Sequence, residues 1–239
     1  MSLIDTAVLL AAGAGTRLRT AAESKPLCVV AGKTLLDHAL ERLAEAGIVR
    51  AIVVTGYRAE AIELHIATRE WPLTVETVRT PDWQLPNGVS ALAAAGPLAG
   101  ASTLLAMCDH LVEPALYARM AAAGAGNGLR LGVDRRLGHP WVDPEDVTFV
   151  ATDSARIVAI GKGMEPHDCY DTGIFAVGQP FFAALAGLEA PSITEAVRVL
   201  AARGAAEVVE CSDLSWIDVD DPKALAAAEA WASSPVTVG

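Results

Sequence analysis

The stretch TAVLLAAGAGTRL, which spans Thr6–Leu18, decides how the rest of this sequence is interpreted. Its first residues, Thr6–Leu10, form a short apolar run that predicts a buried strand. Gly13 and Gly15 follow at once, and glycines allow positive φ and leave backbone N–H groups free to face an anion. Arg17 adds a guanidinium that can bind two phosphate oxygens. We therefore expect a phosphate-binding loop directly after the first strand.

A second positive charge lies downstream in Lys25-Pro26-Leu27, where the proline stiffens the segment. Three other interpretations explain the loop less well. A dinucleotide-binding fingerprint needs a third glycine where Leu18 stands, and a P-loop needs a Gly-Lys-Ser or Gly-Lys-Thr segment that the loop lacks. A plain tight turn accounts for the glycines but not for Arg17 together with Lys25. The loop is thus predicted to cradle a triphosphate.

The rest of the chain alternates between short β-branched runs and helical patterns. This order predicts an α/β fold with a mostly parallel sheet that helices cover and that right-handed crossovers connect. Ligands bind such sheets at the carboxyl ends of the strands. The predicted strands are 6–10, 51–55, 73–78, 103–107 and 128–133, and the predicted helices are 34–46, 59–69, 113–123 and one that begins near Val89.

Short strands replace this alternation in the region 147–177. We expect them to form a small, partly antiparallel insert. It would lie as a lid over the edge of the sheet where ligands bind, on the side of a second substrate, the acceptor. Downstream, Ser192–Glu195 has the capping-box pattern of a helix start, and Asp221 followed by proline caps a last helix. Residues 1–239 are predicted to be a single domain with a frayed tail at 233–239. The strands of the insert are predicted at 147–151, 156–160 and 172–177.

Composition and charge exclude several classes of binding partner. The net charge of −11 argues against nucleic acid as a partner and against an anionic membrane surface, since both need a basic patch. No stretch approaches the roughly 18 apolar residues of a membrane span. The four cysteines lie far apart, which predicts buried free thiols in a reducing cytoplasm and no zinc site or disulfide framework. The sequence leaves open whether the chain forms a homodimer.

Acidic side chains follow predicted strands in two distant parts of the chain. Asp109 lies in Met-Cys-Asp-His after 103–107, and Asp218 lies in Trp-Ile-Asp-Val-Asp-Asp-Pro. Such acids can meet over one Mg²⁺, which prefers oxygen ligands. Helix capping is the alternative role; it suits Asp221 but does not explain Asp218 and Asp220. Because side chains alternate along an extended segment, we expect only one of those two to face the site.

The neighbouring His110 could act as an acid or a base. If the reaction at the triphosphate is an attack by another phosphate group, that group is already ionised and needs no general base. We therefore assign His110 only a minor role.

LAAGAGTRL and Lys25-Pro26-Leu27 resemble the signature of the sugar-phosphate nucleotidyltransferases, which is L-A-A-G-x-G-T-R-L followed by K-P-L. The resemblance extends over nearly the whole chain and implies a Rossmann-like three-layer α/β/α nucleotidyltransferase fold. It also implies that Arg17 and Lys25 hold the phosphates of an NTP as catalytic residues. The family segment W-x-D-V-D-T-P favours Asp218 as the metal ligand beside Asp109, with Asp220 as the second choice. The nucleotide is implied to lie along Leu10, Ala11, Ala12, Gly13, Gly15 and Thr16.

Further segments resemble those that bind base and acceptor in related enzymes. Asn87, Gly88 and Ser90 match an N-G-x-S segment that contacts base and ribose, although a turn with Ser90 as a helix cap explains them almost as well. Lys162 in Ile-Gly-Lys-Gly resembles the lysine that holds the acceptor phosphate, with a solvated hairpin lysine as the alternative. The stretch expected beside the acceptor hydroxyls is Asp171, Thr172 and Gly173, and Arg135 is expected to add a contact to the acceptor phosphate.

Met-Cys-Asp-His, Ile-Gly-Lys and Asp-Thr-Gly-Ile-Phe are most similar to CTP-dependent inositol-1-phosphate cytidylyltransferases. The resemblance implies an Mg²⁺-dependent reaction in which CTP and a polyol phosphate give a CDP-alcohol and pyrophosphate. A hexose-1-phosphate uridylyl- or thymidylyltransferase and a phosphocholine-type cytidylyltransferase are the alternatives within this class. A catalytically silent nucleotide-binding subunit and a nicotinamide oxidoreductase are the alternatives outside it.

Overall fold

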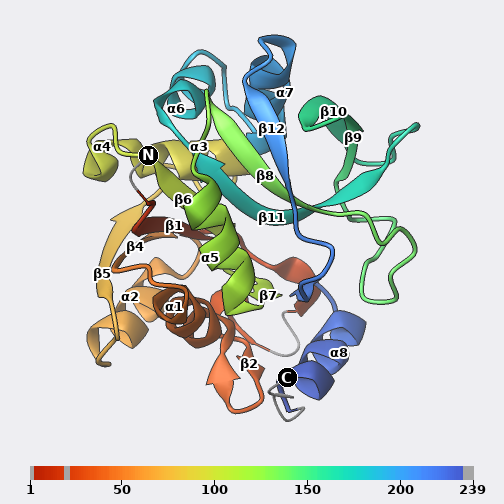
Figure 1. Cartoon of the computed structure of the whole chain (residues 1–239). Helices are drawn as coiled ribbons and strands as arrows, with labels where there is room; N and C mark the ends of the chain where they lie inside the picture. The colour runs from red at the N-terminus through yellow and green to blue at the C-terminus, as the bar shows by residue number, and fades with distance from the viewer. Residues whose placement is uncertain (1–2, 19–21, 234–239) are drawn as a thin grey trace.

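The first predicted strand, β1 (Thr6–Ala11), lies in the middle region of the main sheet of the computed structural model (Figure 1). The structure describes residues 3–18 and 22–233. All residues of β1 are buried, with Ala7 and Leu9 in one apolar core and Val8 and Leu10 in another. A strand that is covered on both faces needs no polar face, which is why it forms a continuous apolar run.

Nine strands of the described chain form the main sheet in the order β5-β4-β1-β6-β11-β8-β12-β10-β9. Only β10 and β11 run against the others, so the prediction of a mostly parallel sheet is confirmed for the described chain. The other strands are β4 (Arg50–Thr55), β5 (Thr74–Arg79), β6 (Thr103–Met107), β8 (Leu129–Asp134), β9 (Phe149–Asp153), β10 (Arg156–Gly161), β11 (Cys169–Val177) and β12 (Ala206–Glu210).

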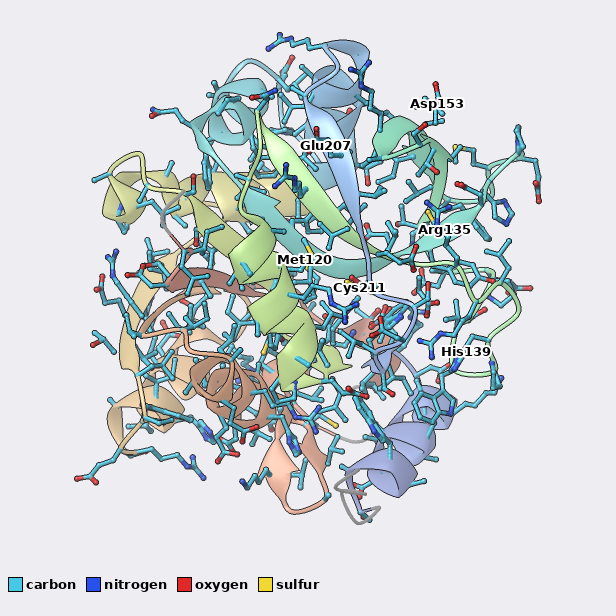
Figure 2. All side chains as sticks on the ribbon, viewed as in Figure 1. Met120, Arg135, His139, Asp153, Glu207 and Cys211 are labelled. Atoms are coloured by element: carbon cyan, nitrogen blue, oxygen red, sulfur yellow. The ribbon has the colours of Figure 1, made fainter. Side chains whose placement is uncertain are left out.

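Helices cover both faces of this sheet and make a three-layer α/β/α fold, as predicted (Figure 1). On one face, Met120 lies in the core between its helix and the sheet (Figure 2). The helices on that face are α1 (Leu35–Glu45), α2 (Ala59–Ala67) and α5 (Pro114–Ala123), and those on the other are α3 (Asn87–Ala93), α4 (Ala95–Leu98), α6 (Gln179–Ala186) and α7 (Ile193–Ala202).

Capping residues mark the ends of several helices in the structure. Thr34 and Ser192 each form a capping box, and the Asp221 side chain accepts the backbone N–H of Ala224 at 2.7 Å. Gly47 has φ of +89°, the left-handed conformation that a glycine adopts readily after a helix. These caps explain why the helix starts were predictable from short stretches of sequence.

The region 147–177 differs from the prediction. Its strands do not form a separate insert: β9 and β10 extend the edge of the main sheet, and β11 lies inside it between β6 and β8. The reason is burial, since all but one of the nine residues of β11 are buried and such a strand is stable only where both faces are covered.

A smaller unit at the edge of the site was not predicted strand by strand. The ribbon β7 (His110–Val112) and β13 (Trp216–Asp218) packs with the hairpin β2 (Val29–Val30) and β3 (Lys33–Thr34) and with α8 (Pro222–Ala232) in a third apolar cluster. Two 3-10 helices, Thr16–Leu18 and Lys25–Leu27, join this unit to the end of β1. In this unit, residues of the segment 18–35 pack against residues of the segment 217–228.

Two composition-based predictions can be compared with the structure. All four cysteines are free and buried, as expected. Among the described residues, no helix has both the length and the apolar character to cross a membrane. The predicted frayed tail lies outside the described residues except for Ser233.

Candidate active site

Neighbouring parallel strands bring the glycine-rich loop and Asp109 to the same edge of the sheet. Strands β1 and β6 pair with Leu10 opposite Met107, so the loops that follow them leave the sheet side by side. The backbone N–H of Cys108 donates to the Leu10 carbonyl at 3.1 Å and continues this pairing beyond the strand. Asp109 is the next residue.

Gly15 is the loop position at which the backbone requires glycine. Its φ is +53°, and a Cβ there would lie 2.4 Å from the Cβ of Lys25. Gly13 has no positive φ and has open space around it, so the expected left-handed conformation applies to Gly15 and was wrong for Gly13. The absence of a side chain at Gly15 lets Lys25 pack against the loop.

An antiparallel ribbon brings Asp218 to the same place. In the β7–β13 pairing Asp218 lies opposite His110, and the Val219 N–H donates to the Asp109 carbonyl at 3.0 Å. Residues opposite each other in such a pair have Cβ atoms about 4.5–5.5 Å apart. The ribbon therefore places Asp218 beside His110, and the Val219–Asp109 hydrogen bond keeps Asp109 close to them.

Lys25 is the cation on which these acids converge. Its side chain is 6% exposed, and its Nζ lies 2.6 Å from Asp109 Oδ2 and 3.7 Å from Asp218 Oδ1 and also contacts Asp220. Arg17 forms an ion pair with Asp220 and a second one, at 2.5 Å, with Asp146. The predicted cations and acids thus form one cluster on one side of the sheet.

Asp220 faces this cluster together with Asp218, so the expectation that only one of them would do so was wrong. Residues two apart on an extended segment share a face, and Val219 between them is fully buried on the opposite side. Asp220 contacts both Arg17 and Lys25. The second choice for a metal ligand therefore belongs to the cluster as fully as the first.

The acids and His110 shift each other's pKa. Burial alone would lower the pKa of His110, but the carboxylates of Asp218 and Asp109 raise it to about 9. Burial would raise the pKa of Asp218, but His110, Lys25 and Arg17 lower it to about 2. The His110 Nδ1 lies 2.8 Å from the Thr172 carbonyl, which only accepts, so this nitrogen carries a proton. The raised pKa of His110 and the lowered pKa of Asp218 thus each favour the charged form of the group.

The carboxylates can hold a cation. Ligand atoms of Asp109 and Asp218 lie within 4.8 Å of each other, and those of Asp146, Asp218 and Asp220 do so as a second set. Two oxygens bound to one Mg²⁺ lie at most about 4.2 Å apart, so a small adjustment brings such a set into range. The enclosed Oδ1 of Asp218 accepts no hydrogen bond from the described residues, which leaves it free to ligate.

Two cavities meet at these carboxylates. The smaller, about 170 Å³, lies against the glycine-rich loop, and the larger, about 310 Å³, opens toward β11 and α7. Asp109 and Asp220 border both cavities, so the acids form the boundary between them. The smaller cavity is lined by Leu10, Ala11, Gly13, Gly15, Lys25, Pro26, Cys108, Asp109 and Asp220. Ala12 and Thr16, also expected at the nucleotide, do not border it.

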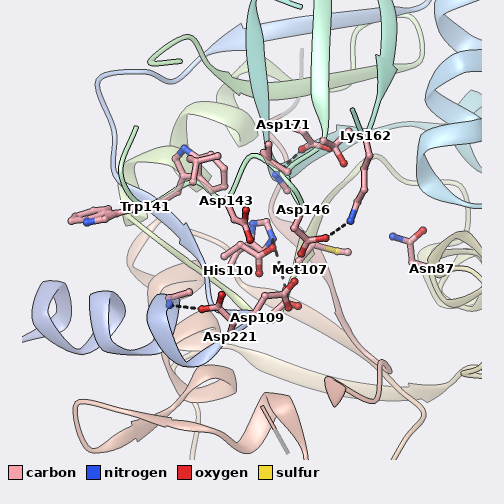
Figure 3. Close-up of a pocket in the computed structure, with 18 of the residues that line it drawn as sticks. Asn87, Met107, Asp109, His110, Trp141, Asp143, Asp146, Lys162, Asp171 and Asp221 are labelled. Carbon is pink, nitrogen blue, oxygen red and sulfur yellow. Dashed lines mark hydrogen bonds and ion pairs between the residues drawn. The ribbon is translucent and has the colours of Figure 1, made fainter. Parts of the chain in front are cut away.

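Asp146 was missed from the sequence and is a principal acid of the larger cavity. It forms ion pairs with Arg17 and with Lys162, whose ammonium points at it in Figure 3. It follows the acidic turn that begins at Asp143, between a strand end and the next strand. A run of acids in such a loop is a weak signal, but it was available in the sequence.

Replacing Asp146 with asparagine is predicted to separate stability from ligand binding. Arg17 and Lys162 are about half exposed or more, so losing their pairs should cost on the order of 1 kcal/mol and lower the melting temperature by about 2–4 °C. The same change frees both cations for phosphate, so affinity for pyrophosphate should rise by roughly threefold to tenfold. Thermal scans and isothermal titration calorimetry measure the two effects. Asp143→Asn, on the same loop, is the control; weaker pyrophosphate binding by Asp146→Asn would contradict the prediction.

The residues expected to contact an acceptor fall into two groups, those that line the larger cavity and those that do not. Lys162, Asp171 and Gly173 line the larger cavity. Burial raises the pKa of Asp171 to about 6, against the opposing effect of the Gly173 N–H that donates to it. Thr172 was wrong as a side-chain contact, because it is fully buried and its hydroxyl donates to the Gly132 carbonyl. Arg135 does not border the cavity; it pairs with Asp168 and Glu210 outside it (Figure 2).

The Asn-Gly-x-Ser segment contributes more to the packing of helices than expected. Asn87 lines the larger cavity while its Oδ1 accepts the Ile193 N–H at 3.0 Å, which fixes α3 to α7. A Cβ on Gly88 would lie 2.4 Å from the Pro191 carbonyl oxygen, so packing alone requires this glycine. Ser90 lies inside α3, which begins at Asn87, so the expected cap at Ser90 was wrong.

Comparison with known proteins agrees with this geometry. The sequence model of the MobA-like NTP transferase domain matches residues 7–210. A "Bifunctional IPC transferase and DIPP synthase" of Rubrobacter xylanophilus is 35% identical over 95% of this chain and 53% of its own length. A relative of the same name from Aquifex aeolicus is 32% identical over 92% of this chain and 50% of its own. The chain thus spans about half the length of these curated relatives.

A solved structure shares the fold. The inositol-1-phosphate CTP transferase from T. maritima superposes with a TM-score of 0.84 at 21% identity, covering 93% of this chain and 92% of that one.

Proposed function

Because this chain belongs to the MobA-like NTP transferase domain family, we propose that it transfers a nucleotidyl group from an NTP to a small alcohol phosphate and releases pyrophosphate. CTP is the proposed donor, and inositol 1-phosphate or a similar polyol phosphate is the proposed acceptor. Among the similar proteins, two are named IPC transferases and one is an inositol-1-phosphate CTP transferase, which supports this choice.

One observation carries the proposal: two cavities share the carboxylates of Asp109 and Asp220, with Lys25 on one side and Lys162 on the other. A reaction that joins two phosphorylated molecules needs two adjacent pockets, each with cations for phosphate. It also needs a means of neutralising charge where the two phosphates meet. The cluster between the cavities is suited to both tasks.

On the donor side, the smaller cavity suits the phosphates of CTP. Backbone N–H groups of the loop around Gly15 and the ammonium of Lys25 are the groups that would bind the triphosphate. Arg17, at the boundary, could bind two oxygens of the α-phosphate once they replace its carboxylate partners. These contacts orient the α-phosphorus toward the larger cavity.

On the acceptor side, the larger cavity suits a polyhydroxylated molecule with one phosphate. Lys162 is the cation available for that phosphate. Asp143 and Asp171 offer carboxylate oxygens that accept hydrogen bonds from hydroxyls. An acceptor held by both its phosphate and its hydroxyls has one orientation, with a phosphate oxygen directed at the α-phosphorus.

Mg²⁺ is the cation that we propose for the carboxylate cluster, with Asp109 and Asp218 as its ligands and Asp220 beside them. When bound, it would neutralise charge on the two reacting phosphates. In the reaction the acceptor phosphate oxygen forms a bond to the α-phosphorus, and the bond from that phosphorus to the β-phosphate oxygen breaks in line with it. Lys25 and Arg17 stabilise the negative charge that passes to pyrophosphate. No proton transfer is required, so His110 need not act as a base.

A panel of the four NTPs against several phosphate acceptors tests the proposal by pyrophosphate release. CTP with inositol 1-phosphate should turn over, and the other pairs should be slower by at least about tenfold, because a site built to hydrogen-bond hydroxyls rejects acceptors that lack them. Faster turnover of glucose 1-phosphate with UTP or dTTP would favour a hexose-1-phosphate uridylyl- or thymidylyltransferase. Turnover with phosphocholine would favour that cytidylyltransferase class. Binding of CTP with no pyrophosphate from any pair would indicate a silent nucleotide-binding subunit.

A reducing cytoplasm is the compartment that we propose for this activity. Each of the four cysteines is a buried free thiol, and burial raises the pKa of Cys169 to about 12 and that of Cys211 to about 11. Such thiols are inert in packing roles and form no disulfide framework.

A further inference from the structure

His110 has no step in the proposed reaction, yet its ring is more buried than the two acids beside it. Its side chain is 11% exposed, against 31% for Asp109 and 35% for Asp218. Nδ1 donates to the Thr172 carbonyl at 2.8 Å, and a Cβ on Gly173 would lie only 2.4 Å from the ring. The irregular pairing of β11 with β8 between Asp171 and Phe175 bends the chain here and turns that carbonyl toward His110.

A second support lies over the face of the ring. The indole of Trp216 stacks on the imidazole at 6.0 Å between centroids and 17° between planes. Trp216 is itself fixed, because its Nε1–H donates at 2.9 Å to Asp134, a fully buried carboxylate that Arg136 also contacts. The ring is thus connected to the core of the sheet through Trp216.

The free edge of the ring faces the two metal-site acids. Nε2 lies 3.6 Å from Asp218 Oδ2 and 3.9 Å from Asp109 Oδ1. Lys25 takes the other oxygen of each acid, Asp109 Oδ2 at 2.6 Å and Asp218 Oδ1 at 3.7 Å. The two carboxylates therefore lie between the Nε2 edge of the His110 ring on one side and the Lys25 ammonium on the other.

This arrangement matters when substrates bind. Lys25 is the group that we expect to turn toward the triphosphate, and it then holds the acids less closely. Two like charges at this spacing repel each other, so they need a second anchor to stay together. Apart from Lys25, His110 is the described basic residue that lies within 4 Å of both acids, so it can provide that anchor.

We propose that His110 is a positioning residue that fixes the spacing and orientation of Asp109 and Asp218 before a divalent cation binds. The inference rests on the proposed function in assuming that these two acids are the metal ligands. His110 acts on the acids through the Nε2 edge of its ring, and the Nδ1 edge, Gly173 and Trp216 keep the ring in place. This role requires no proton transfer.

Two half-replacements of the ring test the proposal. Glutamine can place an amide N–H near the position of Nε2, facing the acids, whereas asparagine can place one near Nδ1, facing Thr172. Mn²⁺ affinity of the nucleotide-free protein is measured by electron paramagnetic resonance, beside the melting temperature and the kinetics of pyrophosphate release. His38→Gln is the matched control, since His38 is also buried, its Nε2 lies 2.8 Å from the Val30 carbonyl, and it is remote from the acids.

The Mn²⁺ dissociation constant should rise by roughly tenfold to a hundredfold in His110→Asn and by less than about threefold in His110→Gln. Turnover should fall in the same order while the KM for CTP stays within about twofold. Equal weakening in both variants that follows the loss of melting temperature would mean a packing role and would overturn the proposal. So would unchanged Mn²⁺ affinity in both, or a selective loss of Zn²⁺ binding, which would make His110 a ligand. Failure of wild-type turnover with normal Mn²⁺ binding would contradict the proposed function and leave these metal measurements decisive for His110.

Discussion

Lys25→Met is expected to lower the rate of pyrophosphate release by about 10²- to 10³-fold, because it removes the one ammonium on which Asp109, Asp218 and Asp220 converge. Methionine keeps most of the side-chain volume, so the loss would come from charge and not from a cavity. The triphosphate would lose its nearest cation at the glycine-rich loop, and the acids would lose the group that reduces their repulsion. Steady-state kinetics with CTP and inositol 1-phosphate measure the effect.

Stability gives a second and separable measure of the same change. The three acids are a quarter to a third exposed, so water solvates them in part, and the ligand-free protein should lose about 1–3 kcal/mol of unfolding free energy. Added Mg²⁺ should restore much of that stability but little of the turnover. Lys33→Met is the matched control, because Lys33 is half exposed and pairs with Glu41 away from the site. Turnover within about threefold of wild type in Lys25→Met would contradict the assigned role.

Asp218→Asn is expected to lower turnover by about 10²- to 10⁴-fold, which corresponds to several kcal/mol of transition-state stabilisation. The change keeps the size of the side chain and removes the charge, together with one oxygen that the described residues leave without a hydrogen-bond donor. Asparagine would also bind a divalent cation poorly. The rate should therefore fall at all Mg²⁺ concentrations and recover only partly at high concentration.

The combined effect of substitutions at Asp109 and Asp218 gives a stricter test of this second prediction. If Asp109 and Asp218 serve one cation, the double variant Asp109→Asn with Asp218→Asn should be little slower than either single variant. Asp153→Asn, an exposed acid on β9 (Figure 2), is the control and should keep wild-type rates. Independent losses that multiply in the double variant would show that the two acids do not act on a shared centre.

Much of the local structure around the glycine-rich loop could be predicted because its residues are close together in the sequence. The apolar run of β1, the glycines that follow and, elsewhere in the chain, the capping box at Ser192 each depend on neighbours within a few positions. Local physics decides such features, since a strand buried on both faces has no polar face and a cap needs a side chain at one position. The parallel direction of β1 and β6 then brings Asp109 to the loop.

The larger cavity could not be predicted in the same way, because contacts between distant segments build it. The ribbon of β7 and β13 consists of two very short strands with no repeating pattern, yet it determines where Asp218 lies. Arg135 and Thr172 have the right chemistry, but Arg135 pairs with Asp168 and the Thr172 hydroxyl donates to the Gly132 carbonyl, and neither residue lines the cavity. Asp146 enters the site because its loop folds across to Arg17, which no local signal specifies.

The charges of the cluster suggest why the ligand-free protein is stable at all. The described cations Arg17, Lys25 and Lys162 pair with four acids, Asp109, Asp146, Asp218 and Asp220. Substrates and a divalent cation would exchange these internal pairs for new ones. Binding can then occur without leaving a buried charge unpaired, which would be costly.

The most direct test of the central claim is ³¹P nuclear magnetic resonance of the reaction of CTP with inositol 1-phosphate and Mg²⁺. Attack at the α-phosphorus predicts equal amounts of pyrophosphate and of a product with two coupled phosphorus signals, the signature of an unsymmetrical diphosphate bridge. Neither product should form when a chelator removes Mg²⁺ or when the Asp218→Asn variant replaces the wild-type protein. Formation of CDP with inorganic phosphate, or of CMP without the bridged product, would contradict nucleotidyl transfer at this site.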